Sequence, residues 1–324
     1  MNGSPPHSPR LKPRGGGPGD GPAAIQLGFV AEPVVELARD GSISLYSECL
    51  ARIMVAGSVL LKPGDFVADL ETGGHIALLD TAMVELVLDA LAADPHVRLG
   101  CNISPLTLAD ADRWAWLIHL IGQRAWLASR LTLEITESFP LDEIAGAAER
   151  LGQAKRLGCR LAIDDFGAGF AASAHLHGVD VDWDIVKVDR SCLGDLRKTP
   201  SGREGLLALV RLARCFAPVV VVEGIETRGH LALARASGAS FGQGWMFDAA
   251  ACTRWTALDG DRGERIAAAV MGRGAVLPPA FEPSDALRTV AAVGQARSRL
   301  LSRVDRLGDR VRALVARSRA GGVS

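Results

Sequence analysis

Seven stretches of this sequence place polar or ionisable side chains inside, or at the end of, an otherwise apolar run. Successive positions lie 20 to 36 residues apart after a first interval of 54, which corresponds to about one βα repeat each and nearly two for the first. In a barrel, successive strands bring such side chains to one face. The residues are Glu48, Asn102, Glu134, Asp164 with Asp165, Lys187, Glu223 and Gln243.

The carboxylates of this set would repel one another and lose hydration at a shared face, which is costly unless a cation compensates their charge. All candidate ligands are oxygens, so the set favours a hard ion such as Mg2+ or Mn2+ over zinc. The adjacent pair Asp164 and Asp165 could serve two ions. Two ions about 4 Å apart would orient a water for in-line attack on a phosphodiester and stabilise the leaving oxygen. The pattern therefore indicates metal-assisted phosphate chemistry.

Each residue taken alone also has a structural explanation. A carboxylate at a strand end can cap a loop or join a surface ion pair. Lys187 could be a solvated side chain that extends from its strand, and Asn102 and Gln243 could be turn amides. This account would have to hold at every position together. The pair His175 and His177 has no third ligand at metal-binding spacing, so we interpret it as structural.

The elements that would position these side chains are short apolar runs separated by stretches of helical periodicity. This pattern predicts an α/β fold, a (β/α)8 TIM-like barrel. Only residues 39–41 separate the first two runs, too few for a crossover helix, so we expect an antiparallel hairpin and one irregular first strand. The runs cover 28–37, 42–53, 97–104, 130–137, 160–167, 184–190, 219–226 and 239–245, and helices are expected at 76–93, 106–127, 142–156, 202–216 and 228–237.

Composition limits the remaining possibilities. The 324 residues are 48% hydrophobic with a formal net charge of -1, which indicates a globular chain and disfavours binding to duplex nucleic acid. The six cysteines show no C-x-x-C spacing, so we expect reduced thiols and a cytoplasmic protein. The most apolar stretch, 205–224, contains two arginines and a proline, so no membrane span is expected.

Three segments are predicted along the chain: a Gly- and Pro-rich disordered tail at 1–24, the barrel at 25–275 and a helical extension at 276–324. The extension carries apolar residues at alternating spacings of four and three from Leu300 to Leu314, with arginines between them. This short heptad pattern is compatible with a dimer seam and with a helix packed on the barrel.

Between residues 26 and 258 the chain resembles the EAL-domain cyclic di-GMP phosphodiesterases. The resemblance rests on motifs in the family's order and at compatible spacing: SECLAR, CNISP, LTLEITES, AIDDFGAGF, DIVKVDRS, VVVEGIET and GQGWMF. It implies a barrel with a reversed first strand and hydrolysis of cyclic di-GMP to the linear dinucleotide pGpG. It also implies a homodimer, since the family commonly dimerises through the barrel.

The resemblance implies a role for each matching residue. Glu48, Asn102, Glu134 and Asp164 correspond to ligands of one metal, and Asp164 and Asp165 would share a second. Glu223 corresponds to a glutamate that is either ligand or general base, and Lys187 to the lysine that holds the attacking water. The supporting positions are Glu226, Gln243 toward the substrate, Arg52 as the grip on a substrate phosphate, and Glu137 as the anchor of the loop that begins DFGAGF.

The sequence also departs from the family pattern. Its signature reads Glu48-Cys49-Leu50, and Ile53 stands where the family usually has tryptophan. Glu32 stands at a common glutamine position, and Asp248 with two alanines replaces the frequent arginine-proline. The intact ligand set favours a hydrolase. The departures keep open a non-catalytic cyclic di-GMP receptor that signals to a protein partner, with the C-terminal helix as a possible contact.

Overall fold

The structure is a computed structural model that describes residues 25–38, 43–55, 59–136, 140–168, 179–196, 200–247, 255–258 and 260–270. The predicted tail at 1–24 and extension at 276–324 lie outside the described residues. The same holds for Glu137, His175, His177 and Asp248.

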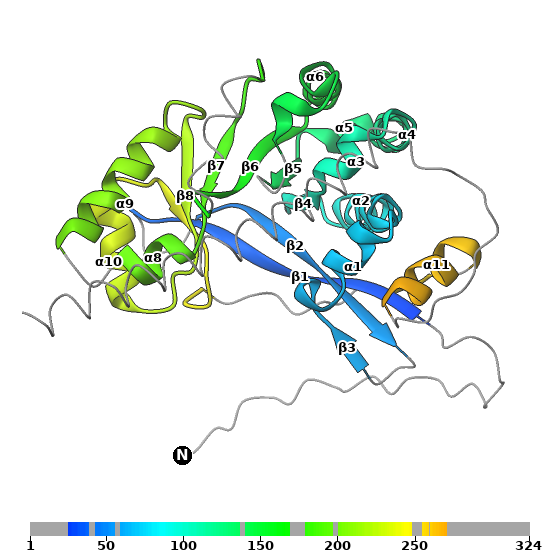
Figure 1. Ribbon diagram of the computed structural model, residues 1–324, viewed down its shortest axis with the longest axis horizontal. Helices are drawn as coiled ribbons and strands as arrows, with labels where there is room; N and C mark the ends of the chain where they lie inside the picture. The colour runs from blue at the N-terminus through cyan, green and yellow to red at the C-terminus, as the bar shows by residue number, and fades with distance from the viewer. Residues whose placement is uncertain are drawn as a thin grey trace, which may run out of the picture.

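Eight strands close into a barrel in the order β1-β9-β8-β7-β6-β5-β4-β2, with β2 returning to β1 (Figure 1). Strand β1 is antiparallel to both of its neighbours, and the other adjacent pairs are parallel. The predicted barrel, its hairpin and its irregular first strand are therefore confirmed. The strands are β1 (Ile25–Glu36), β2 (Ser44–Val55), β4 (Leu99–Ile103), β5 (Leu131–Thr136), β6 (Arg160–Phe166), β7 (Ile185–Val188), β8 (Val219–Val222) and β9 (Phe241–Gly242).

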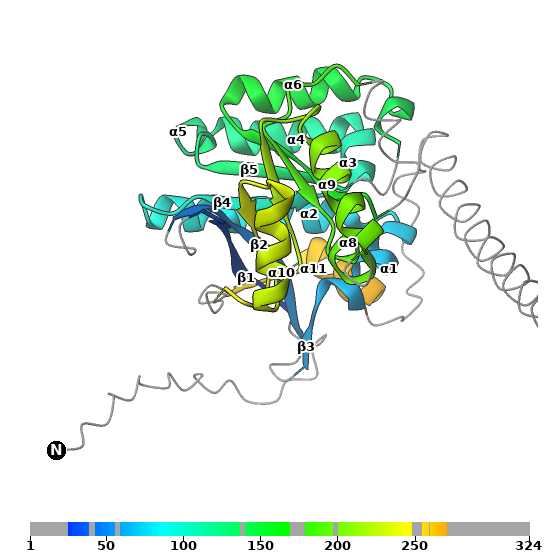
Figure 2. The ribbon, with the colours of Figure 1, turned by 90° about the vertical axis from the view of Figure 1, so that its left-hand side faces the viewer.

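Two further strands extend the sheet beyond the closed barrel, and the sequence pattern did not predict them. Strand β3 (Val59–Leu61) forms an antiparallel hairpin with the end of β2, and this hairpin projects from the barrel in both views (Figures 1 and 2). Strand β10 (Trp255–Ala257) pairs antiparallel with the start of β1.

Helices cover the outside of the barrel (Figure 2). The expected helices at 76–93 and 228–237 are confirmed as α2 and α10. The helices are α1 (Val67–Thr72), α2 (Ile76–Ala93), α3 (Pro105–Ala109), α4 (Ala111–Gly122), α5 (Ala125–Ala128), α6 (Ala147–Leu157), α8 (Ser191–Leu196), α9 (Pro200–Ala213), α10 (Arg228–Ser237) and α11 (Gly260–Val270). Among the helices in the described ranges, none is both long and apolar enough to cross a bilayer.

The prediction of one helix over 106–127 is wrong, because the chain forms three helices there. Asp110 has extended backbone, and its carboxylate accepts hydrogen bonds from the backbone N–H groups of Asp112 and Arg113, so it ends α3 and caps α4. The start of α6 also differs. Residues Leu141–Glu143 form a 3-10 turn, and Gly146 with φ 75° precedes the α-helix, which begins at Ala147 instead of 142.

Apolar packing divides into two regions. The larger lies between the barrel strands and the helices, and a smaller one fills the barrel interior with Val34, Tyr46, Ala162, Ile185 and Val221. Because Gly100 has no side chain, the Tyr46 ring and the Glu134 carboxylate can both lie close to strand β4. A Cβ at Gly100 would lie 2.2 Å from Glu134 Oε1 and 2.5 Å from the Tyr46 ring.

Candidate functional site

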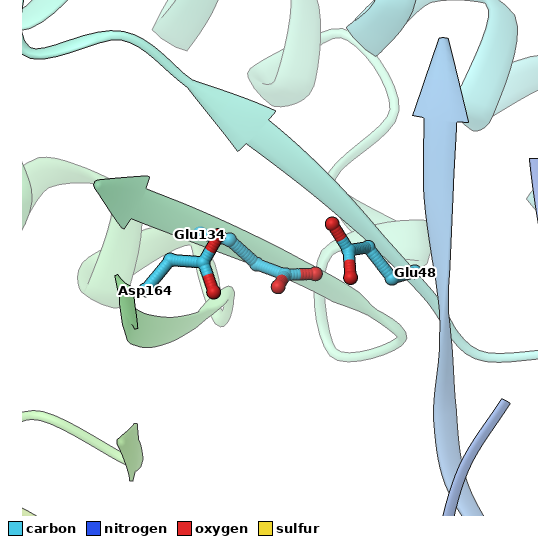
Figure 3. Close-up of side chains that lie close together, drawn as sticks. All are labelled: Glu48, Glu134 and Asp164. Carbon is cyan, nitrogen blue, oxygen red and sulfur yellow. The ribbon is translucent and has the colours of Figure 1, made fainter. Parts of the chain in front are cut away.

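The strand register brings the polar residues of the sequence pattern to one end of the barrel. Asn102 lies beside Glu134 across β4 and β5, and Thr136 lies beside Asp164 across β5 and β6. The carboxylates of Glu48, Glu134 and Asp164 come from three strands and lie close together (Figure 3). This end is the carboxyl rim of the parallel strands, where (β/α)8 enzymes place their chemistry.

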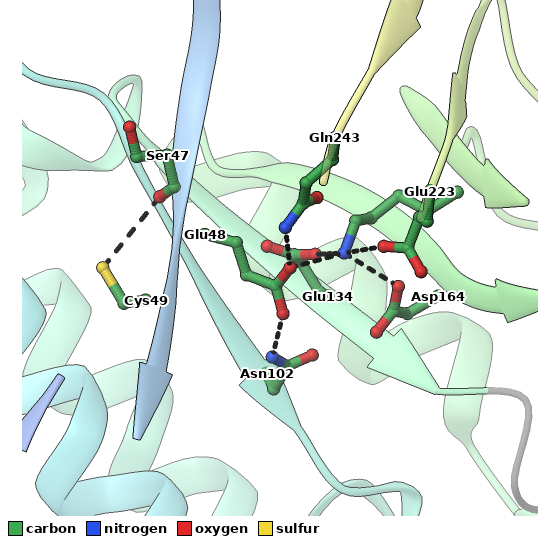
Figure 4. Close-up of polar contacts among 9 residues, drawn as sticks. Ser47, Glu48, Cys49, Asn102, Glu134, Asp164, Glu223 and Gln243 are labelled. Carbon is green, nitrogen blue, oxygen red and sulfur yellow. Dashed lines mark hydrogen bonds and ion pairs between the residues drawn. The ribbon is translucent and has the colours of Figure 1, made fainter. Parts of the chain in front are cut away.

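Lys187 lies at the centre of this group. Its Nζ is 2.9 Å from Glu48 Oε2, 2.6 Å from Glu134 Oε2, 2.9 Å from Asp164 Oδ1 and 2.7 Å from Glu223 Oε1 (Figure 4). The Lys187 side chain is 0% exposed. The interpretation of Lys187 as a solvated surface side chain is therefore wrong. Burial is tolerable because carboxylates surround the ammonium on several sides.

Amide groups fix the orientation of Glu48. Asn102 Nδ2 donates to Glu48 Oε1 at 2.6 Å, and Gln243 Nε2 donates to Glu48 Oε2 at 2.7 Å (Figure 4). The two amides thus hold the carboxylate from either side of β2, and neither is a turn amide. Gln243 was expected to contact substrate; it lines the cavity and also holds this carboxylate.

Asp164 and Asp165 both face the site because strand β6 is irregular between Ile163 and Phe166. In a regular strand, adjacent side chains point to opposite faces. Here the ladder with β7 shifts register, and Asp165 takes φ 57°, the one positive φ among the non-glycine residues that the structure describes. Such a conformation is strained outside glycine and is typical of functional sites.

Two carboxylate groupings result, and they share Asp164. The first comprises Glu48, Glu134 and Asp164, and the second comprises Asp164, Asp165 and Glu223; in each, one oxygen per residue lies within 4.8 Å of the others. The oxygen-only donor set suits a hard divalent cation. The structure therefore brings together residues that could hold two ions.

Burial and charge displace the pKa values of these groups in different directions. Burial raises the pKa of Glu223 to about 8 and that of Asp165 to about 7, although the Lys187 ammonium opposes both shifts. Burial also raises the pKa of Glu134 and Asp164. For Glu48, the Lys187 ammonium and the amide donors outweigh burial and lower the pKa. The carboxylates outweigh burial for Lys187 and raise its pKa.

Several buried oxygens of the site have no hydrogen-bond partner within the described ranges: Asn102 Oδ1, Gln243 Oε1 and Glu134 Oε1. An unpartnered buried acceptor is costly, and a cation ligated by it would satisfy it. The donor set thus fits hard divalent cations, with the amide oxygen of Asn102 as a neutral ligand beside the carboxylates.

A cavity of about 660 Å³ opens over this site. Its wall includes residues of the site together with Asp189, Arg190, Glu226 and Trp245. Arg52 is not part of the wall. Its Nη1 donates to the backbone carbonyls of Leu50 at 3.1 Å and Ala51 at 2.9 Å. The structure therefore does not bring Arg52 to the carboxylates.

Several residues of the cavity wall are absent from the polar pattern of the sequence. Asp189 follows Lys187 by two positions along the same strand direction, a period-two signal that could have identified it. Asp80 gave no such signal because it lies within the apolar helix α2. Its buried carboxylate accepts from Ser104 N at 2.9 Å and Thr107 Oγ1 at 2.5 Å, and burial raises its pKa to about 7.

Fold and site together define a (β/α)8-type barrel with a cluster of carboxylates at its carboxyl rim that could hold metal ions. The EAL domain family model matches residues 22–250, and this chain belongs to that family.

Curated relatives each match about two thirds of the chain. The uncharacterized protein y4lL of Sinorhizobium fredii is 31% identical over 217 residues, which are 67% of this chain and 26% of that protein. Cyclic di-GMP phosphodiesterase NbdA of Pseudomonas aeruginosa is 31% identical, over 68% of this chain and 28% of that protein. Cyclic di-GMP phosphodiesterase PdeF of Escherichia coli is 27% identical, over 67% and 29%. The chain thus spans about a quarter to a third of these relatives.

Solved structures share the fold. An EAL domain protein from Listeria monocytogenes aligns with a TM-score of 0.60 and 23% identity, over 69% of this chain and 88% of that one. The FimX EAL domain from Pseudomonas aeruginosa, bound to c-di-GMP, aligns with a TM-score of 0.59 and 23% identity, over 68% and 88%.

Proposed function

We propose that residues 25–275 form the catalytic unit of a metal-dependent phosphodiesterase that hydrolyses cyclic di-GMP to linear pGpG. The observation that carries this proposal is the pair of carboxylate groupings that share Asp164 at the carboxyl rim of the barrel. Relatives named as cyclic di-GMP phosphodiesterases, at 31% and 27% identity, support the choice of substrate.

The metal ligands follow from the two groupings. Glu48, Asn102, Glu134 and Asp164 would hold one ion, and Asp164, Asp165 and Glu223 a second. Mg2+ or Mn2+ fits this oxygen-only set. When bound, the ions supply an activated water at neutral pH and stabilise charge on the leaving oxygen.

The protein side chains then have distinct tasks. Asn102 and Gln243 hold the Glu48 carboxylate in one orientation through hydrogen bonds of 2.6 and 2.7 Å. Lys187 keeps the buried carboxylates within reach of one another and offers N–H donors to the attacking water. Glu223 either ligates an ion or accepts the proton of that water, and both roles require its carboxylate. Glu137 is proposed as the loop anchor on the family resemblance alone.

The backbone conformation of Asp165 supports a functional role for its carboxylate, because packing of the barrel does not require it. Its positive φ and its partly exposed carboxylate place a strained, acidic residue next to Asp164. A purely structural strand end would not need this conformation. The proposed cytoplasmic location rests on the cysteines, since Cys49, Cys101, Cys159, Cys192 and Cys215 form no disulfide with one another in the described part of the chain.

Glu223→Gln separates the hydrolase from a non-catalytic receptor. The substitution keeps the size of the side chain and removes its negative charge and basicity, so turnover of cyclic di-GMP should fall by about a hundredfold or more. Binding of cyclic di-GMP, followed by calorimetry, should persist. If the unmodified protein binds cyclic di-GMP but cleaves it no faster than Glu223→Gln, the chain is a receptor and the hydrolase proposal is wrong.

A further inference from the structure

Two of the three carboxylates in the first proposed metal grouping are oriented by neutral hydrogen-bond donors. Glu48 accepts from two side-chain amides, and Asp164 accepts from the backbone N–H of Asp165. Glu134 is different. Its Oε2 lies 2.6 Å from Lys187 Nζ, and its Oε1 has no hydrogen-bond partner within the described ranges. A carboxylate that ligates a metal is normally held by a further hydrogen bond, so Glu134 lacks a donor.

An unpartnered donor lies nearby in the barrel interior. Tyr46 is 2% exposed, and its hydroxyl has no hydrogen-bond partner among the described residues. The other unpartnered buried donor in those residues is Trp183 Nε1, which belongs to the outer packing between strands and helices, whereas Tyr46 belongs to the inner cluster. An unpaired buried hydroxyl is costly, and a phenylalanine ring would fill the same space without this cost.

Tyr46 and Glu134 meet over Gly100. Tyr46 precedes Glu48 by two positions on β2, so both side chains point to the interior, and Glu48 lies beside Gly100 on β4. The ideal Cβ position of Gly100 is 2.2 Å from Glu134 Oε1 and 2.5 Å from Tyr46 Cε2, so these two atoms are no further apart than the sum of the two distances. Because Cε2 is bonded to the ring carbon that carries the hydroxyl, the unpartnered donor and the unpartnered acceptor are near neighbours.

We infer that Tyr46 is a positioning residue of the proposed metal site and that its hydroxyl donates to Glu134 Oε1 when this carboxylate binds an ion. The inference rests on the proposed function. With an ion bound, Glu134 no longer depends on the Lys187 ammonium for charge compensation, and its side chain can rotate toward the hydroxyl. The hydrogen bond then limits the orientations of the carboxylate, as the amides do for Glu48. Partners of this kind typically strengthen metal binding by about tenfold to a hundredfold.

Tyr46→Phe removes the hydroxyl and keeps the ring. The dissociation constant of Mn2+ for the metal-free protein, measured by calorimetry without substrate, should rise about tenfold because Glu134 loses its donor. The free energy of unfolding of the metal-free protein, from urea denaturation, should not fall, since the hydroxyl has no partner there. A tyrosine with a merely structural role would show the reverse, a loss of stability and an unchanged Mn2+ affinity.

The chain contains a single tyrosine, which gives a direct spectroscopic test. Protein labelled with carbon-13 at the tyrosine Cζ should give a single NMR signal from the label. This signal should shift when Mg2+ saturates the protein, because the hydroxyl gains an acceptor.

Trp183→Phe is the control, because it removes the other unpartnered buried donor from a position in the outer packing. It should lower the free energy of unfolding through lost packing and leave the Mn2+ affinity unchanged. Equal Mn2+ affinity of Tyr46→Phe and the unmodified protein would overturn the inference alone, as would a tyrosine signal that does not move in protein that binds Mg2+. Unmodified protein that binds neither ion would overturn the proposed function, and the inference with it.

Discussion

Replacing Lys187 with methionine removes the one buried positive charge from a site that holds Glu48, Glu134, Asp164 and Glu223 within 2.6 to 2.9 Å of its Nζ. In metal-free protein, the simplest compensation is the uptake of one proton by one carboxyl group. Protonating a glutamic acid of ordinary pKa 4.5 at pH 8 costs about 5 kcal/mol, at about 1.4 kcal/mol per pH unit. Breaking a buried ion pair costs a similar free energy of unfolding, about 3 to 5 kcal/mol.

The cost depends on pH with a definite sign. A carboxyl group whose folded pKa is raised binds more protons in the folded state, so it destabilises the fold increasingly as pH rises above its ordinary pKa. The deficit of Lys187→Met should therefore be about 3 to 5 kcal/mol at pH 8 and shrink to about 1 kcal/mol at pH 5. Added Mg2+ or Mn2+ should reduce the deficit at pH 8 by replacing the lost charge.

Urea unfolding with chelator at the two pH values measures these free energies. Lys155→Met is the control, because Lys155 pairs with Asp184 at 2.8 Å in a pair that water still reaches, with 26% and 32% of the side chains exposed. This variant should cost about 1 kcal/mol. A Lys187→Met deficit below that of Lys155→Met, or one equal at both pH values, would refute the account of a charge-compensating lysine.

Three further predictions follow from the site and the fold. Hydrolysis of cyclic di-GMP should require Mg2+ or Mn2+, stop in excess chelator and be inhibited by Ca2+, whose longer coordination positions water poorly; undiminished turnover in chelator would rule out the proposed ions. Gly100→Ala should destabilise the barrel by about 1 to 3 kcal/mol in urea unfolding, because its Cβ would lie 2.2 Å from Glu134 Oε1; unchanged stability would show that the interior can relax. The protein should sediment as a homodimer, and truncation near residue 283 should leave the barrel folded; a monomer at concentrations of full activity would contradict the dimer.

The sequence predicts the barrel well because each strand is a short apolar run with a turn signal on either side. The seven positions of the polar pattern meet at one end of the barrel because strand pairing aligns the carboxyl ends of the parallel strands. Asn102, for example, lies beside Glu134. Helix boundaries were less predictable. Asp110 ends one helix and caps the next through its side chain. Apolar periodicity does not predict this break, because the apolar spacing continues across it.

The sequence pattern could not predict the side-chain contacts across the barrel. Lys187 and Glu48 are 139 residues apart in sequence, and their contact depends on how the strands close into a ring. The sequence also could not predict that the Arg52 guanidinium donates to nearby backbone carbonyls, because that contact depends on the local backbone geometry. The irregularity in β6 that turns Asp165 toward Asp164 is likewise a property of the ladder with β7 and not of the residues DD themselves.

Product analysis tests the central claim most directly. Purified protein is incubated with cyclic di-GMP and Mg2+ or Mn2+, and the nucleotides are resolved by chromatography over time, with Glu223→Gln in parallel. We expect the unmodified protein to convert cyclic di-GMP to linear pGpG, at a rate about a hundredfold or more above that of the variant. Cyclic di-GMP that remains intact with either ion, in protein shown to bind it, would contradict the assignment of these carboxylates to phosphodiester hydrolysis.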